Sequence, residues 1–424
     1  MKTIFTSALL AAVSVATADV NFTSMGTFNL KNAAFPSVAS FGDAPEDKFL
    51  LVSSFGALSS GAVYVVPSIK AAIVNKTVSQ LKPVSLPLHR TNFQWPNDVK
   101  VVPFDVFGQR AIVVPDGFLV PGKTNGGVYI ITMDPSNITL TTSVTKISTE
   151  PKGYFYHMGE WVDMNGDGRK DFVTARSNAK AGGGQLVWFE HPAEGISGEW
   201  TEHVVTSGPD VGIQVIKAPQ YPNEIVVFAA EFFNEKVSVH RVSTVDGTLV
   251  QSKEIDVGTI LHAYSVTYAD INGDGVKELI VNNHEKDNKT NGIWAYTFPS
   301  DWMTGTYTKT TLSSNFNNKF SLTVPNMAPG FPYPFYPQVS TTGKVPAHIL
   351  VAGDGDHTAW IMTPTDNKFT YVRDSIKEEN GTVGALCFDD LDGDDWQELF
   401  VPDYDDSRIE VFKFSAKTAQ LFLQ

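Results

Sequence analysis

A strand–turn–strand unit that recurs seven times is the feature that most constrains how this 424-residue chain can fold. Each copy has an apolar, β-prone run, a turn rich in Gly or polar residues, and a second run that often carries an aromatic residue. The first runs begin about 50 to 70 residues apart. The copies are Phe49 to Val66, Ala111 to Met133, Asp171 to Pro192, Glu224 to Val242, Glu278 to Phe298, Ala347 to Pro364 and Glu398 to Phe414. This repetition predicts one repeated architecture rather than several unrelated domains.

Short strand-like runs between the copies, such as Trp200 to Thr206 and Tyr264 to Tyr268, raise each unit to about four strands. Helical periodicity is absent beyond the first 18 residues. The sequence therefore predicts an all-β, seven-bladed β-propeller of four-stranded antiparallel blades, in which closure protects the sheet edges. A linear β-solenoid is the alternative, but its repeats would be shorter and more regular. The last outer strand is expected from Val20 to Leu30 or from Ala419 to Leu423, and the sequence does not choose between them.

Three of the units are preceded by loops that share one spacing of oxygen-bearing side chains. A Gly at the fourth position of each loop allows a tight turn. Oxygens at alternating positions can close around a hard cation such as Ca²⁺, which takes six to eight of them. The expected ligands are Asp163, Asn165, Asp167, Arg169 and Asp171; Asp270, Asn272, Asp274, Val276 and Glu278; and Asp390, Asp392, Asp394, Trp396 and Glu398, where Arg169, Val276 and Trp396 offer their carbonyl oxygens.

The flanks of these loops indicate what kind of calcium site they form. An EF-hand loop lies between two helices and ends in a bidentate Glu. Here each loop runs directly into a strand, as in Glu278-Leu-Ile-Val. About three structural calcium ions are therefore expected, and acidic turns without metal are the alternative.

The first 18 residues have the features of a secretory signal, with Lys2, an apolar run and the small residues Ala16-Thr17-Ala18. Residues 19–424 are then expected to form the single mature propeller domain, which is secreted and extracellular. No later stretch approaches the roughly 20 apolar residues of a membrane span. Asn-x-Thr sequons predict glycosylation at Asn21, Asn75, Asn137, Asn288 and Asn380. A formal net charge of −14 argues against a nucleic-acid partner.

The geometry of the repeat predicts where a functional site can form. The turns between second and third strands, and the starts of the inner strands, should gather on the face opposite the calcium loops. Four of the nine histidines, His157, His262, His284 and His357, are expected on that face. Imidazoles beside carboxylates could hold a transition metal or transfer protons. The alternative for each is a histidine that is only hydrogen-bonded or solvated.

Aromatic and acidic residues in the same turns suggest ligand binding. Phe232, Phe233 and Tyr404 are candidates for stacking on a sugar ring, and Asp354 and Asp356 for accepting hydroxyl hydrogens. The alternative is that aromatic residues, 12% of the chain, fill the wedge-shaped spaces between blades. The sequence contains no nucleophile elbow, phosphate-binding Gly loop or zinc-protease helix.

The pattern Asp-x-Asn-Gly-Asp-Gly-x-x-Asp/Glu followed by an apolar strand resembles the FG-GAP/VCBS repeat of integrin α-subunit propellers. The resemblance implies a seven-bladed propeller with calcium between the first two strands of a blade. The motif is sharp in only three units, so no calcium is expected in the other four. The segments Gly183 to Pro192 and Trp200 to His203 look like secreted fungal and microbial members, some of which are lectins and one branch of which is a sugar lyase.

Three functions remain open from the sequence. The first is a secreted, calcium-stabilised propeller that binds a ligand, with carbohydrate favoured, on the face opposite the loops or between blades. The second is a lyase or isomerase for a sugar or small metabolite with a histidine site in the channel. The third is an adhesion module that binds protein. Whether the chain is an enzyme is not decided by its sequence.

Overall fold

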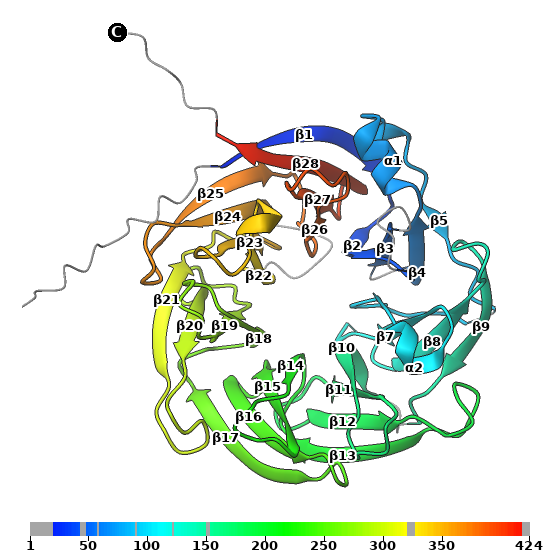
Figure 1. Ribbon diagram of the computed structural model, residues 1–424, viewed down its shortest axis with the longest axis vertical. Coiled ribbons are helices and arrows are strands. Elements are labelled where there is room, and N and C mark those ends of the chain that lie inside the picture. Colours follow the sequence, from blue (N-terminus) through cyan, green and yellow to red (C-terminus); the bar gives the residue numbers. More distant parts are fainter. Residues whose placement is uncertain are drawn as a thin grey trace, which may run out of the picture.

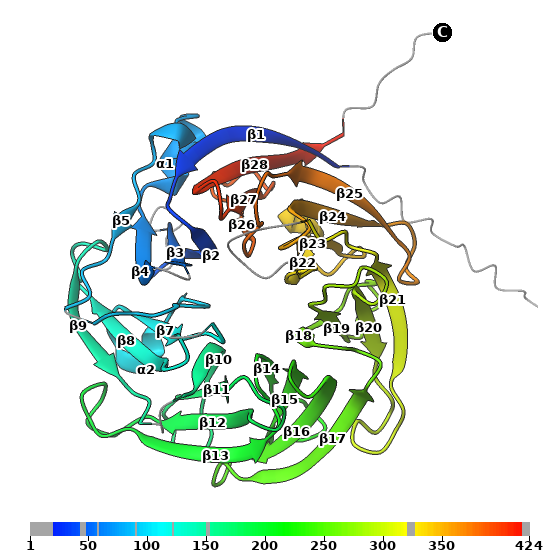
Figure 2. The same cartoon turned by 180° about the vertical axis from the view of Figure 1, so that it is seen from behind.

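The computed structural model describes residues 20–42, 48–56, 59–89, 91–120, 123–149, 153–319 and 327–417. In this part of the chain the strands form seven four-stranded sheets around a central channel (Figures 1 and 2). Neighbouring strands within each sheet run antiparallel. The seven-bladed propeller is thus confirmed, and the solenoid alternative is excluded.

Each of the first six blades is built from consecutive strands, ordered from the channel outward. Blades one to three are β2 (Ala33–Ala39), β3 (Phe49–Gly56), β4 (Ser59–Val66) and β5 (Val84–Ser85); β6 (Lys100–Val101), β7 (Ala111–Asp116), β8 (Gly127–Met133) and β9 (Thr141–Lys146); and β10 (Phe155–Val162), β11 (Asp171–Ser177), β12 (Gln185–Glu190) and β13 (Thr201–Ser207). Blades four to six are β14 (Gly212–Ile216), β15 (Glu224–Glu231), β16 (Lys236–Ser243) and β17 (Leu249–Val257); β18 (Ala263–Ala269), β19 (Glu278–Asn283), β20 (Gly292–Thr297) and β21 (Thr308–Ser314); and β22 (Pro332–Phe335), β23 (His348–Ala352), β24 (Thr358–Pro364) and β25 (Tyr371–Glu378).

The seventh blade joins the two ends of the described chain. It consists of β26 (Cys387–Asp389), β27 (Glu398–Asp403), β28 (Arg408–Ala416) and, as its outer strand, β1 (Val20–Asn29). β1 pairs with β28 from Val20 opposite Ala416 to Asn29 opposite Arg408. Of the two segments expected to close the ring, the N-terminal one does so (Figure 1). The segment from Ala419 to Leu423 lies outside the described residues.

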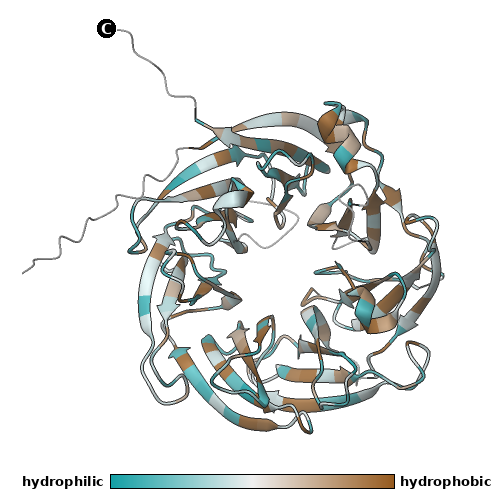
Figure 3. Ribbon diagram, in the orientation of Figure 1, coloured by the Kyte–Doolittle hydropathy of each residue, from teal (hydrophilic) through white to brown (hydrophobic). Residues whose placement is uncertain are grey.

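The hydrophobic core is divided into clusters that lie between neighbouring blades. One cluster joins Val226 of blade four to Leu279 of blade five, and another joins Phe335 of blade six to Phe412 of blade seven. The second strands are buried along nearly their whole length, whereas the outer strand β17 is mostly exposed. Figure 3 shows hydrophilic residues along β17. Most aromatic residues therefore fill the spaces between blades, as the alternative interpretation of the aromatic content proposed.

The described residues also include short helices that hydrophobic periodicity did not predict. They are α1 (Ile69–Val74), α2 (Phe104–Phe107), η2 (Val78–Gln80) and η3 (Val339–Thr341). Each spans fewer than two helical turns, which is too short for a period of 3.6 residues to be recognised. None of the helices within the described ranges is long and apolar enough to cross a membrane.

Candidate functional site

A cavity of about 480 Å³ opens at the centre of one face of the propeller. Its lining comes from the starts of inner strands, such as Phe35 in β2 and Phe155 in β10, and from turns after second strands, such as Phe232 after β15. The acidic loops connect inner strands to second strands, so they lie at the opposite face. The site therefore forms on the face that the repeat geometry predicted.

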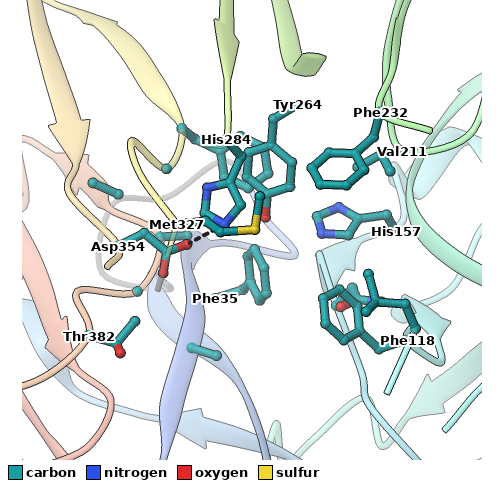
Figure 4. A pocket seen from close by; sticks show the side chains of 18 of the residues that line it. Phe35, Phe118, His157, Val211, Phe232, Tyr264, His284, Met327, Asp354 and Thr382 are labelled. Carbon is teal, nitrogen blue, oxygen red and sulfur yellow. Dashed lines mark ion pairs between the residues drawn. The ribbon is translucent and has the colours of Figure 1, made fainter. Parts of the chain in front are cut away.

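Aromatic side chains from every blade form the walls of this central pocket. They are Phe35, Phe55, Trp95, Phe118, Phe155, Phe232, Phe233, Tyr264, Phe331 and Tyr404. Figure 4 shows Phe35, Phe118, Phe232 and Tyr264 among them. Such a wall favours a ligand with apolar faces, because stacked rings gain both buried area and a preferred geometry.

Two stacked columns of rings stiffen the pocket on blades that face each other across the channel. In one, Trp95 lies between Phe55 and Phe118, with centroid distances of 4.3 and 4.9 Å. In the other, Tyr264 lies between His284 and Phe331, at 4.6 and 4.8 Å. These contacts hold the rings in fixed positions before any ligand arrives, which lowers the entropy cost of binding.

His157 of β10 lies in the pocket lining among aromatic rings. Its ring lies edge-on to Phe35, Tyr264 and Phe331, with centroid distances of 5.6, 5.8 and 5.9 Å. The side chain is 1% exposed. Burial lowers the pKa of His157 to about 4, so the imidazole is neutral at neutral pH.

Buried carboxylates accept hydrogen bonds from the main chain of aromatic residues that line the pocket. Asp210 accepts hydrogen bonds from the main-chain N–H groups of Phe232 and Phe233 at 2.7 and 2.8 Å. Asp116 accepts one from the N–H of Trp95 at 2.7 Å. Asp210 was not predicted to act at the site. Its sequence signal is weak, because an acid next to a strand is most often a solvated turn residue.

His262 and Glu285 form a hydrogen-bonded pair at the pocket wall. Nδ1 of His262 contacts Oε1 of Glu285, which leaves Nε2 as the remaining ring nitrogen. The ring also packs on Phe232 at a centroid distance of 4.6 Å. His262 has a φ of +46°, in the left-handed region that residues other than glycine adopt uncommonly. A histidine oriented by a carboxylate can act as a general base.

A second histidine–carboxyl pair joins His284, in the turn after β19, to Asp354, in the turn after β23 of blade six. His284 Nδ1 lies 3.1 Å from the carbonyl oxygen of Pro329, to which it can donate, and Nε2 lies 3.8 Å from Oδ2 of Asp354. Burial raises the pKa of Asp354 to about 8 and lowers that of His284 to about 4. Both groups are therefore largely uncharged at neutral pH, with the proton on Asp354.

The structure brings together most, but not all, of the residues that the sequence singled out. His157, His262, His284, Phe232, Phe233, Tyr404 and Asp354 line the pocket. Asp356 does not, because its carboxylate accepts hydrogen bonds from Trp360 Nε1 and Thr358 N at 2.8 and 2.9 Å. His357 is also outside the lining and is 5% exposed. No sequence pattern distinguished Phe35, Phe55 or Phe118, which look like ordinary strand aromatics.

The three pocket histidines do not form a compact metal site. Within the described ranges, Asp390, Asp392 and Glu398 are the one group of three or more His, Cys, Asp or Glu residues whose ligand atoms lie within 4.8 Å of one another. The pocket histidines therefore fit hydrogen bonding or proton transfer better than shared coordination of a transition metal.

The three acidic loops share one backbone fold. The first Asp of each loop accepts hydrogen bonds from two later main-chain N–H groups, as Asp270 does from Gly273 and Gly275 at 2.8 and 2.9 Å. The fourth-position Gly of each has a φ between +75° and +83°, as the turn requires. The last carboxylate is buried, and burial raises the pKa of Glu278 to about 7. The oxygen donors suit calcium, which would favour the ionised form.

The remaining predicted sites differ in what can be described. All five sequon asparagines, at positions 21, 75, 137, 288 and 380, are exposed. The signal segment, residues 1–18, lies outside the described residues.

Comparisons with known proteins support the fold alone. No protein-family model matches the sequence, and no curated protein matches it. The solved structure of the Dos1 propeller is similar, with a TM-score of 0.51 and 12% identity over 92% of this chain and 94% of that one. The periplasmic gluconolactonase PpgL of Pseudomonas aeruginosa is also similar, with a TM-score of 0.50 and 11% identity over 81% and 84% of the two chains. The β-propeller is therefore shown, and the FG-GAP/VCBS resemblance stays a prediction.

Proposed function

We propose that the protein binds an uncharged carbohydrate in the central pocket. The observation that carries this proposal is the convergence of aromatic rings from all seven blades on one cavity of about 480 Å³. That volume lies in the range of small-molecule sites. Sugar rings present apolar C–H faces that stack on aromatic rings, and hydroxyl groups that bond to a few polar side chains.

The charge state of the pocket supports an uncharged ligand. His157 and His284, with pKa values lowered to about 4 by burial, and Asp354, with its pKa raised to about 8 by burial, are largely neutral at pH 7. Glu285 is paired with His262, and Lys286 lies exposed at the rim. An acidic sugar would lose water around its carboxylate without gaining a buried counter-charge.

The proposal is tested by titrating neutral and acidic monosaccharides and short oligosaccharides into the protein by calorimetry. Phe233→Ala removes a partly exposed section of the pocket wall and should cost about 1 kcal/mol, which lowers affinity roughly fivefold. Phe104→Ala is the matched control, because Phe104 is 57% exposed in α2 and outside the pocket. No binding of any sugar, or equal losses in the two variants, would refute carbohydrate binding in this pocket.

The second candidate function is that of a lyase or isomerase, and the His262–Glu285 pair favours it. Such enzymes begin by removing a proton from the carbon next to a carbonyl group. His262 Nε2 has the role of the base, Glu285 positions it, and protonated Asp354 can donate to the carbonyl oxygen.

Proton removal is measured as exchange of that hydrogen for deuterium in D₂O, by NMR, with dihydroxyacetone and D-fructose as probes. His262→Gln should slow the exchange about 100-fold. His203→Gln is the control, because His203 forms a similar pair with Glu190 at 2.8 Å, in β13 and away from the pocket. Wild-type exchange no faster than that of His262→Gln would exclude this enzymatic role.

We propose further that calcium stabilises the acidic loops of blades three and five, and that the protein is secreted and glycosylated at its exposed sequons. The shared loop fold and the oxygen donors support the calcium proposal. The acidic loop of blade seven is not included, because a lysine side chain lies among its carboxylates.

A further inference from the structure

The three acidic loops face different residues on the third strand of their blades. In blade seven, Glu398 of β27 is directly opposite Lys413 of β28. The register of blade three places Glu190 opposite Asp171, and that of blade five places Thr297 opposite Glu278. The last acid of the loop therefore faces an acid, a neutral residue and a base in blades three, five and seven.

Lys413 reaches the carboxylates that the loop pattern assigns to calcium. Its Nζ lies 2.7 Å from Asp392 Oδ2, 3.0 Å from Asp394 Oδ1 and 2.6 Å from Glu398 Oε1. These are the third, fifth and ninth positions of the loop. The ammonium donates hydrogen bonds to Asp392 and Glu398 and forms an ion pair with Asp394.

The contacts of Lys413 explain why the carboxylate groups of the blade-seven loop lie close together. Oxygens of Asp390, Asp392 and Glu398 lie within 4.8 Å of one another, a separation at which like charges repel strongly. A cation among them offsets this repulsion, and Lys413 supplies one. Within the described residues, the loops of blades three and five show no comparable gathering of carboxylates.

The basic side chains Lys277 and Arg169, near the loops of blades five and three, do not bridge several loop carboxylates as Lys413 does. In blade five, Lys277 points to the ring of Tyr268, with its Nζ 5.1 Å from the centroid. In blade three, Arg169 contacts Asp167 alone among the loop acids. These two loops keep their remaining carboxylate oxygens available for an ion.

We propose that the Lys413 ammonium replaces calcium in blade seven, so that this loop is stabilised by the chain itself. A calcium ion needs oxygens at about 2.3–2.6 Å and would have to share the space between Asp392 and Glu398 with a positive charge. This departs from the resemblance, which implies an ion in every sharp loop. It is independent of the proposed ligand in the central pocket.

The position of this loop gives the replacement a structural consequence. Blade seven is the blade in which β1 and β28 close the ring. Its loop between β26 and β27 then folds without an ion, so closure of the ring does not depend on calcium. Removal of calcium would act on blades three and five.

The test measures calcium content by elemental analysis after equilibration with calcium and removal of unbound ion. Asp274→Ala, in blade five, should lose one calcium relative to the wild type, whereas Asp392→Ala, in blade seven, should lose none. Lys413→Thr gives blade seven the residue of blade five and should gain one calcium. The inference is overturned if Asp392→Ala loses one calcium, or if folded Lys413→Thr gains none. The comparison of Asp392→Ala with the wild type decides the question if Lys413→Thr does not fold.

Discussion

Buried histidines and carboxyl groups make the stability of this protein depend on pH in opposite directions. Burial lowers the pKa of His157, His240, His284 and His348 to about 4, so the folded state binds fewer protons than the unfolded state between pH 4 and 6.5. Their stabilising effect is complete above pH 6.5 and is lost as the pH falls toward 4. Burial raises the pKa of buried carboxyl groups, and that of Asp210 is about 7. The stability that such a protonated carboxyl group contributes is present at low pH and is lost as the pH rises through its folded-state pKa.

His348 offers the clearest test of this balance, because neither of its ring nitrogens has a hydrogen-bond partner among the described residues. His348→Leu removes a group that resists protonation in the folded state. The unfolding free energy of the variant minus that of the wild type should be about 2 kcal/mol larger at pH 5 than at pH 8. Denaturant unfolding at both pH values measures the difference. A difference between the two proteins that is the same at pH 5 and pH 8 would contradict the assigned pKa shift.

At the scale of elements, the sequence predicted the central strands of the blades well. The copy from Phe49 to Val66 coincides with β3 and β4, and the copy from Ala111 to Met133 with β7 and β8. These strands are buried on both faces, so their apolar runs are long and distinct. The inner strand β6 and the outer strand β5 have two residues each and carry no periodic pattern. The helices α1 and α2 were missed for the same reason.

Turn conformation limited the prediction of the site. The position of an inner strand or a turn in the repeat was enough to place His157, His262 and His284 at one cavity. It was not enough for Asp356 and His357, because Asp354 and His357 adopt positive φ values of 53° and 62° that redirect the chain. Hydrogen bonds from Trp360 and Thr358 then hold Asp356 away from the pocket. Such long-range partners are not visible in a local sequence pattern.

At the scale of the whole molecule, the pocket exists only because the ring closes. Its lining is drawn from all seven blades, and Tyr404 of blade seven donates a hydrogen bond to the carbonyl oxygen of Phe55 in blade one at 2.7 Å. The pairing of β1 with β28 therefore shapes the site as well as the fold. The acidic loops act at the opposite face, where they connect inner strands to second strands. One face of the propeller thus carries the acidic loops, and the other, the proposed binding face, carries the pocket.

The most direct test of the proposed binding face is a crystal structure of the protein with a neutral sugar that binds in the calorimetric titration. The predicted result is a sugar ring in the central pocket, stacked on Phe232 or Phe233 and in hydrogen-bond contact with the His262, His284 or Asp354 side chain. A sugar bound only on the outer strands, between blades or at the face of the acidic loops would contradict the assignment of the pocket as the functional site.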